Sequence, residues 1–144
     1  MNSRRAIPTD IEKIAELLIP FCEEYHQKVV TQETAIKGIR HLFENPHLGR
    51  YYICEEEGRV IGYLMVFFEW SDWRAGNMYY IEAVYTIPDF RNRGVSKSLY
   101  KNMYDDAITE NSVLRTIVPI TFSTEALKKI GLQESHYNLL EIKF

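Results

Sequence analysis

The stretch from Met78 to Met103 constrains the fold most, because it joins a buried strand to an amphipathic helix through a short basic turn. Residues 78–87 are rich in aromatic and β-branched side chains, which favour a strand covered on both faces. Pro88 ends that strand, since proline donates no hydrogen bond to a sheet. Apolar residues then recur with helical spacing from Val95 onwards. The sequence therefore predicts a strand, a turn and a helix in direct succession.

The turn has the composition of a phosphate-binding site. Its sequence is Arg91-Asn92-Arg93-Gly94-Val95-Ser96. Unpaired backbone N–H groups at a helix N-terminus attract anions, and Gly94 lets a phosphate approach the backbone closely. Arg91 and Arg93 would add charge-assisted hydrogen bonds. The turn lacks the Gly-Lys-Ser/Thr ending of a P-loop and the three spaced glycines of a dinucleotide fingerprint, so it belongs to neither class.

The pattern Arg91-x-x-Gly94-x-Ser96 resembles motif A of the GNAT superfamily of N-acetyltransferases, Arg/Gln-x-x-Gly-x-Gly/Ala, with serine at the last small position. In that family the backbone amides of the motif hold the pyrophosphate of acetyl-CoA, the co-substrate. The resemblance implies an α/β (α+β) fold with a mixed, mostly antiparallel sheet of six to seven strands. Helices would cover both faces, and the central strand pair would splay apart. A single domain would span residues 1–144.

The resemblance also implies which residues contact acetyl-CoA. The main chain of Val84, Tyr85 and Thr86 would pair with the pantetheine arm, beside a bulge in the central strand. The phosphates would lie against the turn and the start of the helix, which comprise Arg91, Asn92, Arg93, Gly94, Val95, Ser96 and Lys97.

The remaining pattern predicts other elements in the order that the family has. Further strands are expected near residues 3–6, 51–55, 60–69, 113–118 and 136–144, with a hairpin turn at Gly58. Helices are expected from Thr9 or Asp10, with a break or kink at Pro20, from Thr31 to about Asn45, and over 124–130 before Gly131. A loop is expected from Trp70 to Asn77.

The sequence constrains the catalytic acid less closely. The family often places a tyrosine four residues before the glycine that ends the last helix, and an asparagine seven residues earlier. The corresponding residues are Leu127 and Ile120, neither of which donates a proton. The substitutes are Tyr100, Tyr104, Ser123 and Tyr85, although the helical spacing of Tyr100 and Tyr104 favours side chains of the core. Solvent as the acid, or a protein that does not catalyse transfer, are the alternatives.

Glu82 is the predicted general base that accepts the proton of the acceptor amine. It lies in an otherwise uncharged strand, where burial would raise its pKa towards neutrality. Strand alternation would place it on the face of Tyr80, Val84 and Thr86. In related diamine and small-amine acetyltransferases, an acidic residue at this place lines the acceptor cleft. A glutamate that faces solvent at the splayed edge fits the sequence equally well.

Two segments, residues 21–26 and 69–74, border the substrate side in the fold that the chain resembles. Carboxylates there would hold a cationic amine, and aromatic rings would provide cation–π contacts. The predicted acceptor-binding residues are Glu24, Tyr25, Asp72 and Trp73, which favour a small amine or polyamine. A solvated helix end, and tryptophans that fasten a loop to the body, are the alternatives.

Composition and charge exclude several classes of protein. Of the 144 residues 46% are hydrophobic, and the net charge is -3, which gives no electrostatic case for binding nucleic acid. Cys22 and Cys54 form no disulfide scaffold or metal pattern, and the four histidines lack metal-ligand spacing. No apolar run is long enough for a membrane span, and no apolar segment follows the basic N-terminus.

We therefore expect a cytoplasmic, acetyl-CoA-dependent N-acetyltransferase that acts on a primary amine by direct attack. It would have no metal, no nucleic acid partner and no membrane partner. The alternative is a non-catalytic acyl-CoA-binding or interaction domain of the same fold. The aromatic strand Tyr137–Phe144 would suit pairing across the edge of a homodimer.

Overall fold

The structure is a computed structural model, and it describes residues 1–118 and 124–143 apart from the side chain of Ala126. Five strands form one sheet in the order β1-β2-β3-β4-β5. The strands are β1 (Asn2–Arg5), β2 (Gly49–Glu56), β3 (Arg59–Ser71), β4 (Gly76–Thr86) and β5 (Leu114–Thr116). Neighbours are antiparallel except for β4 and β5, which are parallel. The mixed, mostly antiparallel sheet is thus confirmed, but with five described strands instead of six to seven.

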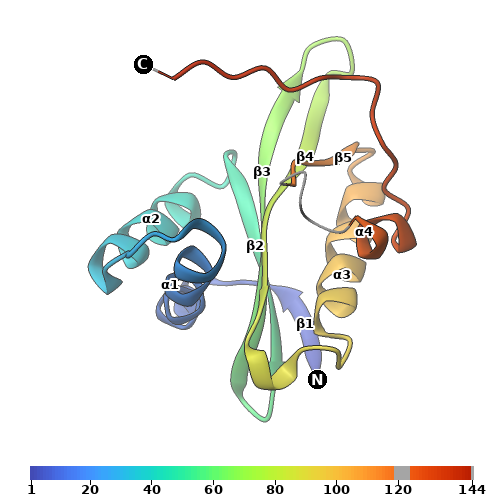
Figure 1. Cartoon of the computed structure of the whole chain (residues 1–144). Helices are drawn as coiled ribbons and strands as arrows, with labels where there is room; N and C mark the ends of the chain where they lie inside the picture. Colours follow the sequence, from blue (N-terminus) through green and yellow to red (C-terminus); the bar gives the residue numbers. More distant parts are fainter. Residues whose placement is uncertain (119–123, 144) are drawn as a thin grey trace.

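Helices cover both faces of this sheet, as Figure 1 shows. On one face lie α1 (Ile11–His26) and α2 (Gln32–Glu44), and on the other lie α3 (Val95–Thr109) and the short α4 (Glu125–Lys129). Two 3-10 turns, η1 (Pro8–Asp10) and η2 (Pro88–Phe90), precede α1 and the basic turn. The predicted layers are therefore confirmed, and β4, η2, the basic turn and α3 follow one another as expected.

The helix α2 forms where its sequence pattern predicts. Thr31 is its N-cap residue, and the Thr31 hydroxyl accepts a hydrogen bond from the backbone N–H of Thr34 at 3.2 Å. Ala35, Ile39 and Leu42 recur on one side of the helix and are buried. The helix ends before Asn45, as expected from the proline that follows.

The helix α1 is not broken at Pro20, which lies inside the helix. A proline in this position removes one backbone hydrogen bond. Leu17 before it and Phe21 after it are both buried in the core. Packing against the sheet therefore continues the helix through the proline. The helix α1 ends at His26, and Gln27 after it has a left-handed φ of 52°.

Asp10 secures the start of α1 through tertiary contacts and makes no hydrogen bond as a helix cap. Its side chain is only 2% exposed. It accepts hydrogen bonds from Arg4 Nη1 at 2.7 Å and from the backbone N–H of Ile7 at 2.9 Å. Burial alone would raise the pKa of Asp10, but the hydrogen bonds from Arg4 and Ile7 outweigh it and hold the pKa below its ordinary value. Asp10 thus ties β1 to α1 in its charged form.

We expect acid to weaken the fold through this carboxylate. Because the pKa of Asp10 is lower in the folded state, the unfolded chain takes up the proton first as the pH falls. The free energy of unfolding should therefore decrease as the pH drops below about 4. Urea titrations at several pH values between 7 and 3 would measure this. The Asp10→Asn variant should be less stable at pH 7 and show a shallower pH dependence; equal slopes would contradict the prediction.

The turn predicted at Gly58 is confirmed, but the strands on either side of residues 72–75 are longer than predicted. Glu57 and Gly58 have φ values of 50° and 80°, so both central residues of the turn between β2 and β3 are left-handed. The strands β3 and β4 run on to Ser71 and Gly76, which shortens the expected loop of residues 70–77 to residues 72–75. Cross-strand pairs at the end of the hairpin, including Trp70 with Asn77, extend the ladder into this loop.

The predicted final strand is wrong for residues 136–143, which pair with no strand in the described part of the chain. Phe144 lies outside the described residues. The strand predicted over residues 113–118 is present but shorter, because β5 covers only Leu114–Thr116. A sequence with high strand propensity forms a strand only where a neighbouring strand satisfies its backbone N–H and C=O groups. Propensity alone therefore did not predict which residues pair in the sheet.

Candidate functional site

A β-bulge in β4 shapes the middle of the sheet. Met65 pairs with Ala83 and Val66 pairs with Ile81, so Glu82 is the extra residue on β4. The bulge reverses the side-chain alternation along the strand. Tyr79 accordingly donates a hydrogen bond to Glu110, the residue after α3, at 2.5 Å, whereas Tyr85 packs against Phe21 of α1 on the opposite face.

The prediction that Glu82 shares a face with Tyr80, Val84 and Thr86 is therefore wrong. Tyr80 stacks on Phe67 with ring centroids 4.5 Å apart and lies on the face opposite to Tyr79. Val84 and Thr86 face α3 instead, where the Thr86 hydroxyl lies 3.4 Å from that of Ser96. The Glu82 side chain is exposed, so the burial that the prediction assumed is absent as well.

The strands β4 and β5 separate just after the bulge. Their last pair is Ile81 with Thr116, beyond which β4 has a strand neighbour only on the β3 side within the described residues. The backbone N–H of Ile87 donates to Ile61 of β3 at 3.1 Å. Alternation then directs the backbone groups of Val84 and Thr86 away from β3, to the open edge. The backbone groups of Tyr85 face Tyr63 of β3 instead, so the predicted main-chain contact of Tyr85 with the pantetheine arm is not supported. The splayed strand pair is thus confirmed. It leaves the backbone groups of Val84 and the N–H of Thr86 available to another extended chain, while the Thr86 carbonyl accepts a hydrogen bond from Arg91.

The basic turn presents a row of backbone N–H groups at the start of α3. Asn92 and Gly94 have φ values of 62° and 83°. The first helical hydrogen bond runs from Ser98 N–H to Gly94 O at 3.0 Å. Among the described residues, no acceptor takes a hydrogen bond from the backbone N–H groups of residues 92–97. A Cβ atom on Gly94 would have only Met1 Cε, at 3.9 Å, within 4 Å, so the space in front of the turn is open to an anion.

The two arginines of the turn are oriented by carboxylates from other elements. Arg91 donates from Nη2 to Glu24 of α1 at 2.6 Å and from Nε to the Thr86 carbonyl at 3.0 Å. The hydrogen bond to Glu24 raises the pKa of Arg91. Arg93 donates to Glu56 at the end of β2 at 3.1 Å. Both guanidinium groups still have N–H donors that make no hydrogen bond to a described residue, so they can contact a phosphate as well. Those contacts stay a prediction.

The rest of the predicted phosphate-binding residues lie along the first turn of α3. Val95 is buried and packs the helix start onto the sheet, Ser96 is half-buried and Lys97 is exposed. Gly62 of β3 allows this close packing, because a Cβ atom there would lie 2.7 Å from Val95 Cγ1 and 2.9 Å from Tyr85 O. The position of the basic turn against the sheet therefore depends on a glycine that lies outside the turn.

The predicted acceptor-binding residues fall into two separate groups. The hydrogen bonds of Arg91 place Glu24 at the Thr86 end of β4. Asp72 and Trp73 lie beyond the opposite end, at the tip of the long β3–β4 hairpin (Figure 1). At about 3.3 Å per residue, the ends of β4 are roughly 30 Å apart. The two segments therefore do not line one site for a small amine.

The hairpin tip has its own contacts. Asp72 accepts a hydrogen bond from the backbone N–H of Trp73 at 2.7 Å. The guanidinium of Arg74 lies 4.5 Å from the Trp73 ring centroid, so one cation already covers that ring. Both observations support the alternative that these residues order their own loop.

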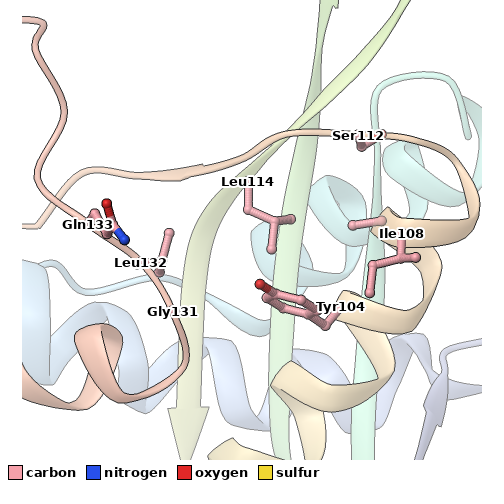
Figure 2. Close-up of a pocket in the computed structure, with 8 residues that line it drawn as sticks. Tyr104, Ile108, Ser112, Leu114, Gly131, Leu132 and Gln133 are labelled. Carbon is pink, nitrogen blue, oxygen red and sulfur yellow. The ribbon is translucent and has the colours of Figure 1, made fainter.

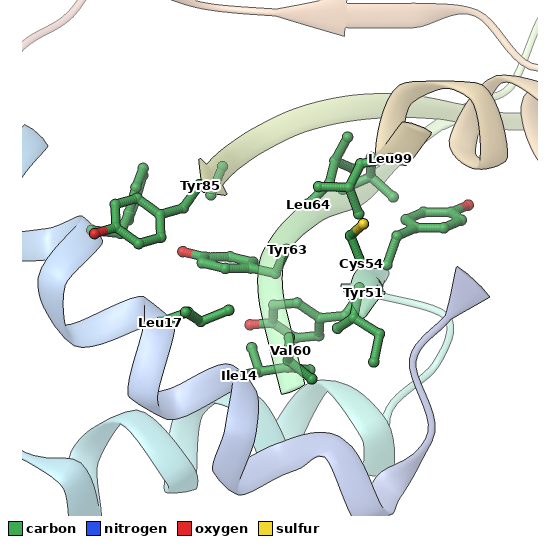
Figure 3. Packing of buried hydrophobic residues seen from close by; sticks show 14 of the residues in the cluster. Ile14, Leu17, Tyr51, Cys54, Val60, Tyr63, Leu64, Tyr85 and Leu99 are labelled. Atoms are coloured by element: carbon green, nitrogen blue, oxygen red, sulfur yellow. The ribbon is translucent and has the colours of Figure 1, made fainter. Parts of the chain in front are cut away.

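The group at α1 adjoins an aromatic cluster on the same face of the sheet. The rings of Phe21 and Tyr25 are 5.2 Å apart, and both contact Tyr85 of β4, at 6.2 and 6.5 Å between centroids. Tyr63 of β3 lies next in this cluster, as Figure 3 shows. Its side chain is fully buried, and its hydroxyl has no hydrogen-bond partner among the described residues. Burial raises the pKa of Tyr63, and the negative charge of Glu82 raises it further.

We expect the Tyr63→Phe variant to be as stable as the wild type or more stable. An unsatisfied buried hydroxyl costs about 1–3 kcal/mol, and phenylalanine keeps the ring packing without it. Chemical denaturation would measure the difference in the free energy of unfolding. Tyr52→Phe is the matched control, because the Tyr52 hydroxyl donates to Asp106 at 2.6 Å and its removal should be destabilising. A loss of stability in Tyr63→Phe would indicate a partner for this hydroxyl.

The two tyrosines proposed as acids lie side by side on α3 but differ in exposure. Tyr100 is half-buried, and burial raises the pKa of Tyr100 to about 12. Tyr104 is exposed and borders a pocket of about 350 Å³ between α3, β5 and the end of α4 (Figure 2). A Cβ atom on Gly131 would lie 3.5 Å from the Tyr104 hydroxyl. This hydroxyl therefore lies next to the glycine that follows α4, close to the region where the family places its tyrosine.

The other candidates contribute less. Leu127 is buried, as its apolar character requires. Ile120 and Ser123 lie outside the described residues. Across residues 1–118 and 124–143, no three His, Cys, Asp or Glu side chains gather closely enough to hold a metal ion. In the same residues no helix has the length and apolar character that a membrane crossing requires.

Sequence reasoning missed two features of the site. The ion pair between Glu24 and Arg91 joins residues that are 67 positions apart, and nothing local to either residue signals it. The orphaned Tyr63 hydroxyl was missed for the same reason, because its environment consists of side chains from α1, β2 and β4. The bulge itself was expected from the family, but its position at Glu82 follows from the pairing of β4 with β3.

Comparison with known proteins agrees with this geometry. Residues 11–128 match the sequence profile of the acetyltransferase (GNAT) family. No curated protein matches the chain in sequence. The fold is similar to that of a possible acetyltransferase from Clostridium difficile 630, with a TM-score of 0.89 and 23% identity over 99% of this chain and 97% of that chain.

Two aminoglycoside acetyltransferases have the same fold. The 6'-N-acetyltransferase from Acinetobacter haemolyticus has a TM-score of 0.78 and 15% identity, and the alignment covers 100% of this chain and 99% of that chain. An aminoglycoside N-acetyltransferase in complex with CoA has a TM-score of 0.80 and 16% identity over 99% of this chain and 93% of that chain. At these identities the structural likeness shows the fold, whereas the profile match over most of the chain shows the family. The chain is therefore an N-acetyltransferase of the acetyltransferase (GNAT) family.

Proposed function

We propose that the protein transfers the acetyl group of acetyl-CoA to the primary amine of a small cationic molecule by direct attack. One observation carries the proposal: the free backbone N–H groups of residues 92–97 lie next to the open edge of β4. An anion-binding helix start beside unpaired strand edges suits a long ligand with a pyrophosphate at one end and amides in its arm. Acetyl-CoA has both features, and it is the acyl donor of the family.

Each part of acetyl-CoA has a candidate partner in this chain. The backbone groups of Val84 and the N–H of Thr86 at the open edge would pair with the amides of the pantetheine arm. The N–H groups of residues 92–97 would hold the pyrophosphate, with Arg91, Arg93 and Lys97 supplying positive charge. Arg91 can take part without losing its hydrogen bonds to Glu24 and Thr86, because a guanidinium has five N–H donors. The acetyl thioester supplies the activated carbonyl for transfer.

Glu82 is the proposed base. It is the extra residue of the bulge, its side chain is exposed, and it directly follows Ile81, the last residue of β4 that pairs with β5. An exposed carboxylate attracts an ammonium group from solvent and can accept the proton that leaves the amine as it attacks the thioester. Glu24 and Tyr25, near the Thr86 end of β4, are the acceptor contacts that this structure supports. Asp72 and Trp73 are not part of the proposed site, because they lie at the far end of the hairpin.

The acid that protonates the departing thiolate is proposed to be Tyr104 or Tyr100. The Tyr104 hydroxyl is the more accessible of the two, and Tyr100 lies one helical turn nearer to the start of α3. Phenylalanine at the residue responsible should lower kcat by about 10²- to 10⁴-fold without changing the affinity for acetyl-CoA. If neither variant lowers kcat, solvent protonates the thiolate.

We expect Glu82→Gln to lower kcat/KM by about 10²-fold at neutral pH, because glutamine keeps the shape but accepts no proton. The affinity for acetyl-CoA should be unchanged, since Glu82 contributes no part of the phosphate site. Thiol release from acetyl-CoA would be followed across pH for the wild type and the variant. Glu69→Gln, which removes an exposed carboxylate elsewhere on the sheet, is the matched control and should leave the rate unchanged. Equal rates for Glu82→Gln and wild type at every pH would remove Glu82 as the base.

The amine acceptor is tested by the same assay. A panel of diamines, polyamines and aminoglycosides would be compared with a peptide that has a free N-terminus and a lysine. Two structural neighbours are aminoglycoside acetyltransferases, which supports a small-molecule amine. Thiol release with small amines and not with the peptide would support the proposal. Tight binding of acetyl-CoA without release for any amine would favour the alternative, an acyl-CoA-binding domain that does not catalyse transfer.

A further inference from the structure

Glu24 lies where a helix least favours a carboxylate. It is in the last turn of α1, which ends at His26, and its side chain is exposed. The C-terminal end of a helix carries a partial negative charge, so an acidic residue there is disfavoured. The helix itself therefore gives no reason for a glutamate at this position, and its tertiary contact is the feature that accounts for it.

That contact is with Arg91, whose side chain is held at the end of β4 from three directions. Its Nε donates to the Thr86 carbonyl at 3.0 Å, and its Nη2 donates to Glu24 Oε2 at 2.6 Å. Its guanidinium carbon lies 5.6 Å from the ring centroid of Tyr85. The Tyr85 ring is buried between β4 and α1 (Figure 3), so it is a fixed support. Together these contacts determine where the guanidinium lies and how it is turned.

The orientation leaves donors of Arg91 for a ligand. A guanidinium has five N–H groups, of which the two hydrogen bonds use one on Nε and one on Nη2. No described residue accepts a hydrogen bond from the others. Arg91 directly precedes the free backbone N–H groups of residues 92–97. A phosphate at those N–H groups can therefore also receive charge-assisted hydrogen bonds from Arg91.

Glu24 decides how freely the guanidinium can turn before a ligand arrives. The Thr86 carbonyl holds only Nε, which leaves the guanidinium free to rotate about that one hydrogen bond. The contact of Glu24 with the outer nitrogen removes this freedom. Arginine has many rotamers, and a ligand that must immobilise such a side chain loses affinity. Without Glu24, acetyl-CoA would have to restrict Arg91 as it binds.

The charge of Glu24 acts in the opposite sense, because a carboxylate repels phosphate. The side chains of Glu24 and Arg91 are 39% and 37% exposed, so water and salt screen this repulsion. The orientation of the guanidinium depends on hydrogen-bond geometry instead, which screening does not remove. We therefore expect the gain from a fixed guanidinium to exceed the repulsion.

We propose that Glu24 is a positioning residue for acetyl-CoA, which holds the Arg91 guanidinium in the orientation that receives the pyrophosphate. This role rests on the proposed function, because acetyl-CoA is the ligand proposed there. It adds a contribution on the donor side to the acceptor contact of Glu24. The Oε2 atom binds Arg91, whereas Oε1 accepts no hydrogen bond from a described residue and stays available to an amine. One carboxylate thus adjoins both substrates.

A double-mutant cycle on the affinity for acetyl-CoA tests this role. Glu24→Ala should raise the Kd by about fivefold, which corresponds to about 1 kcal/mol. The same substitution in the Arg91→Ala background should leave the Kd of that background unchanged, because no guanidinium remains to be positioned. Glu24→Gln keeps a hydrogen-bond acceptor without the charge, so its Kd should lie closer to wild type than to Glu24→Ala. Isothermal titration at moderate salt would measure all of these values.

Glu23→Ala is the matched control. It removes the same charge from the same exposed turn of α1, but Glu23 accepts no hydrogen bond from Arg91. Its Kd for acetyl-CoA should equal that of the wild type. Both alanine variants remove an exposed carboxylate from an unfavourable helix end, so both should fold, which circular dichroism would check.

Four results would overturn the proposal. These are a Kd in Glu24→Ala no higher than in wild type, a loss that persists in the Arg91→Ala background, an equal loss in Glu23→Ala, or a Glu24→Gln variant as weak as Glu24→Ala. Each of them leaves acetyl-CoA binding by the wild type intact. Failure of the proposed function is distinguished from them, because the wild type itself would then not bind acetyl-CoA, and both proposals would be overturned.

Discussion

Replacement of Gly94 by glutamate is expected to abolish acetyl-CoA binding. The new side chain would enter the open space in front of the N–H groups of residues 92–97, where it would exclude a pyrophosphate by bulk and repel it by charge. We expect the dissociation constant to rise more than about 100-fold, which corresponds to about 2.7 kcal/mol. Isothermal titration of acetyl-CoA into wild type and variant at moderate salt would measure it.

Three control variants separate the causes of this loss. Gly94→Ala introduces the strain of a left-handed φ, about 1–2 kcal/mol, without bulk or charge and should still bind. Gly94→Gln adds the bulk without the charge. Gly38→Glu adds the same charge in α2, where a Cβ atom meets nothing within 4 Å, and should bind as wild type does. Unchanged affinity in Gly94→Glu would remove the basic turn as the phosphate site.

The variant Gly62→Ala is expected to lower the free energy of unfolding by about 1–3 kcal/mol, although it adds a single methyl group. That methyl would lie 2.7 Å from Val95 Cγ1 and 2.9 Å from the Tyr85 carbonyl, so either α3 or β4 must move. Valine is β-branched and has little rotamer freedom in a helix, so it cannot turn away. Because Val95 begins α3, the same shift should displace the N–H groups of residues 92–97 and weaken acetyl-CoA binding.

The test compares stability and affinity in the same set of variants. Gly38→Ala is the matched control, since the added methyl has free space in the interior of α2 and should stabilise by about 0.5–1 kcal/mol. Gly62→Ala/Val95→Ala removes the side-chain half of the clash and should recover part of both losses. Stability of Gly62→Ala equal to wild type would show that the sheet and α3 are less tightly packed than the structure indicates.

Local patterns predicted much of the fold from the sequence. The helix expected from Thr31 to about Asn45 formed as α2 (Gln32–Glu44), because the periodicity of an amphipathic helix is contained in a few adjacent residues. The break expected at Pro20 did not occur, because α1 packs against the sheet on both sides of the proline. The local pattern failed at residues 136–143, where a strand-like sequence pairs with no strand among the described residues.

The sequence by itself determined the chemistry of the basic turn and therefore the family. Arg91, Gly94 and Ser96 are close together in the chain, and the backbone N–H groups of residues 92–97 need only the helix behind them and a glycine at a left-handed φ to face an anion. The tertiary structure alone decided that Glu82 is the extra residue of the bulge, which carboxylate holds Arg91 and which strand edge stays open. These features depend on the pairing of β4 with β3 and on the contact of α1 with the turn, which join residues that are far apart in sequence and leave no local signal.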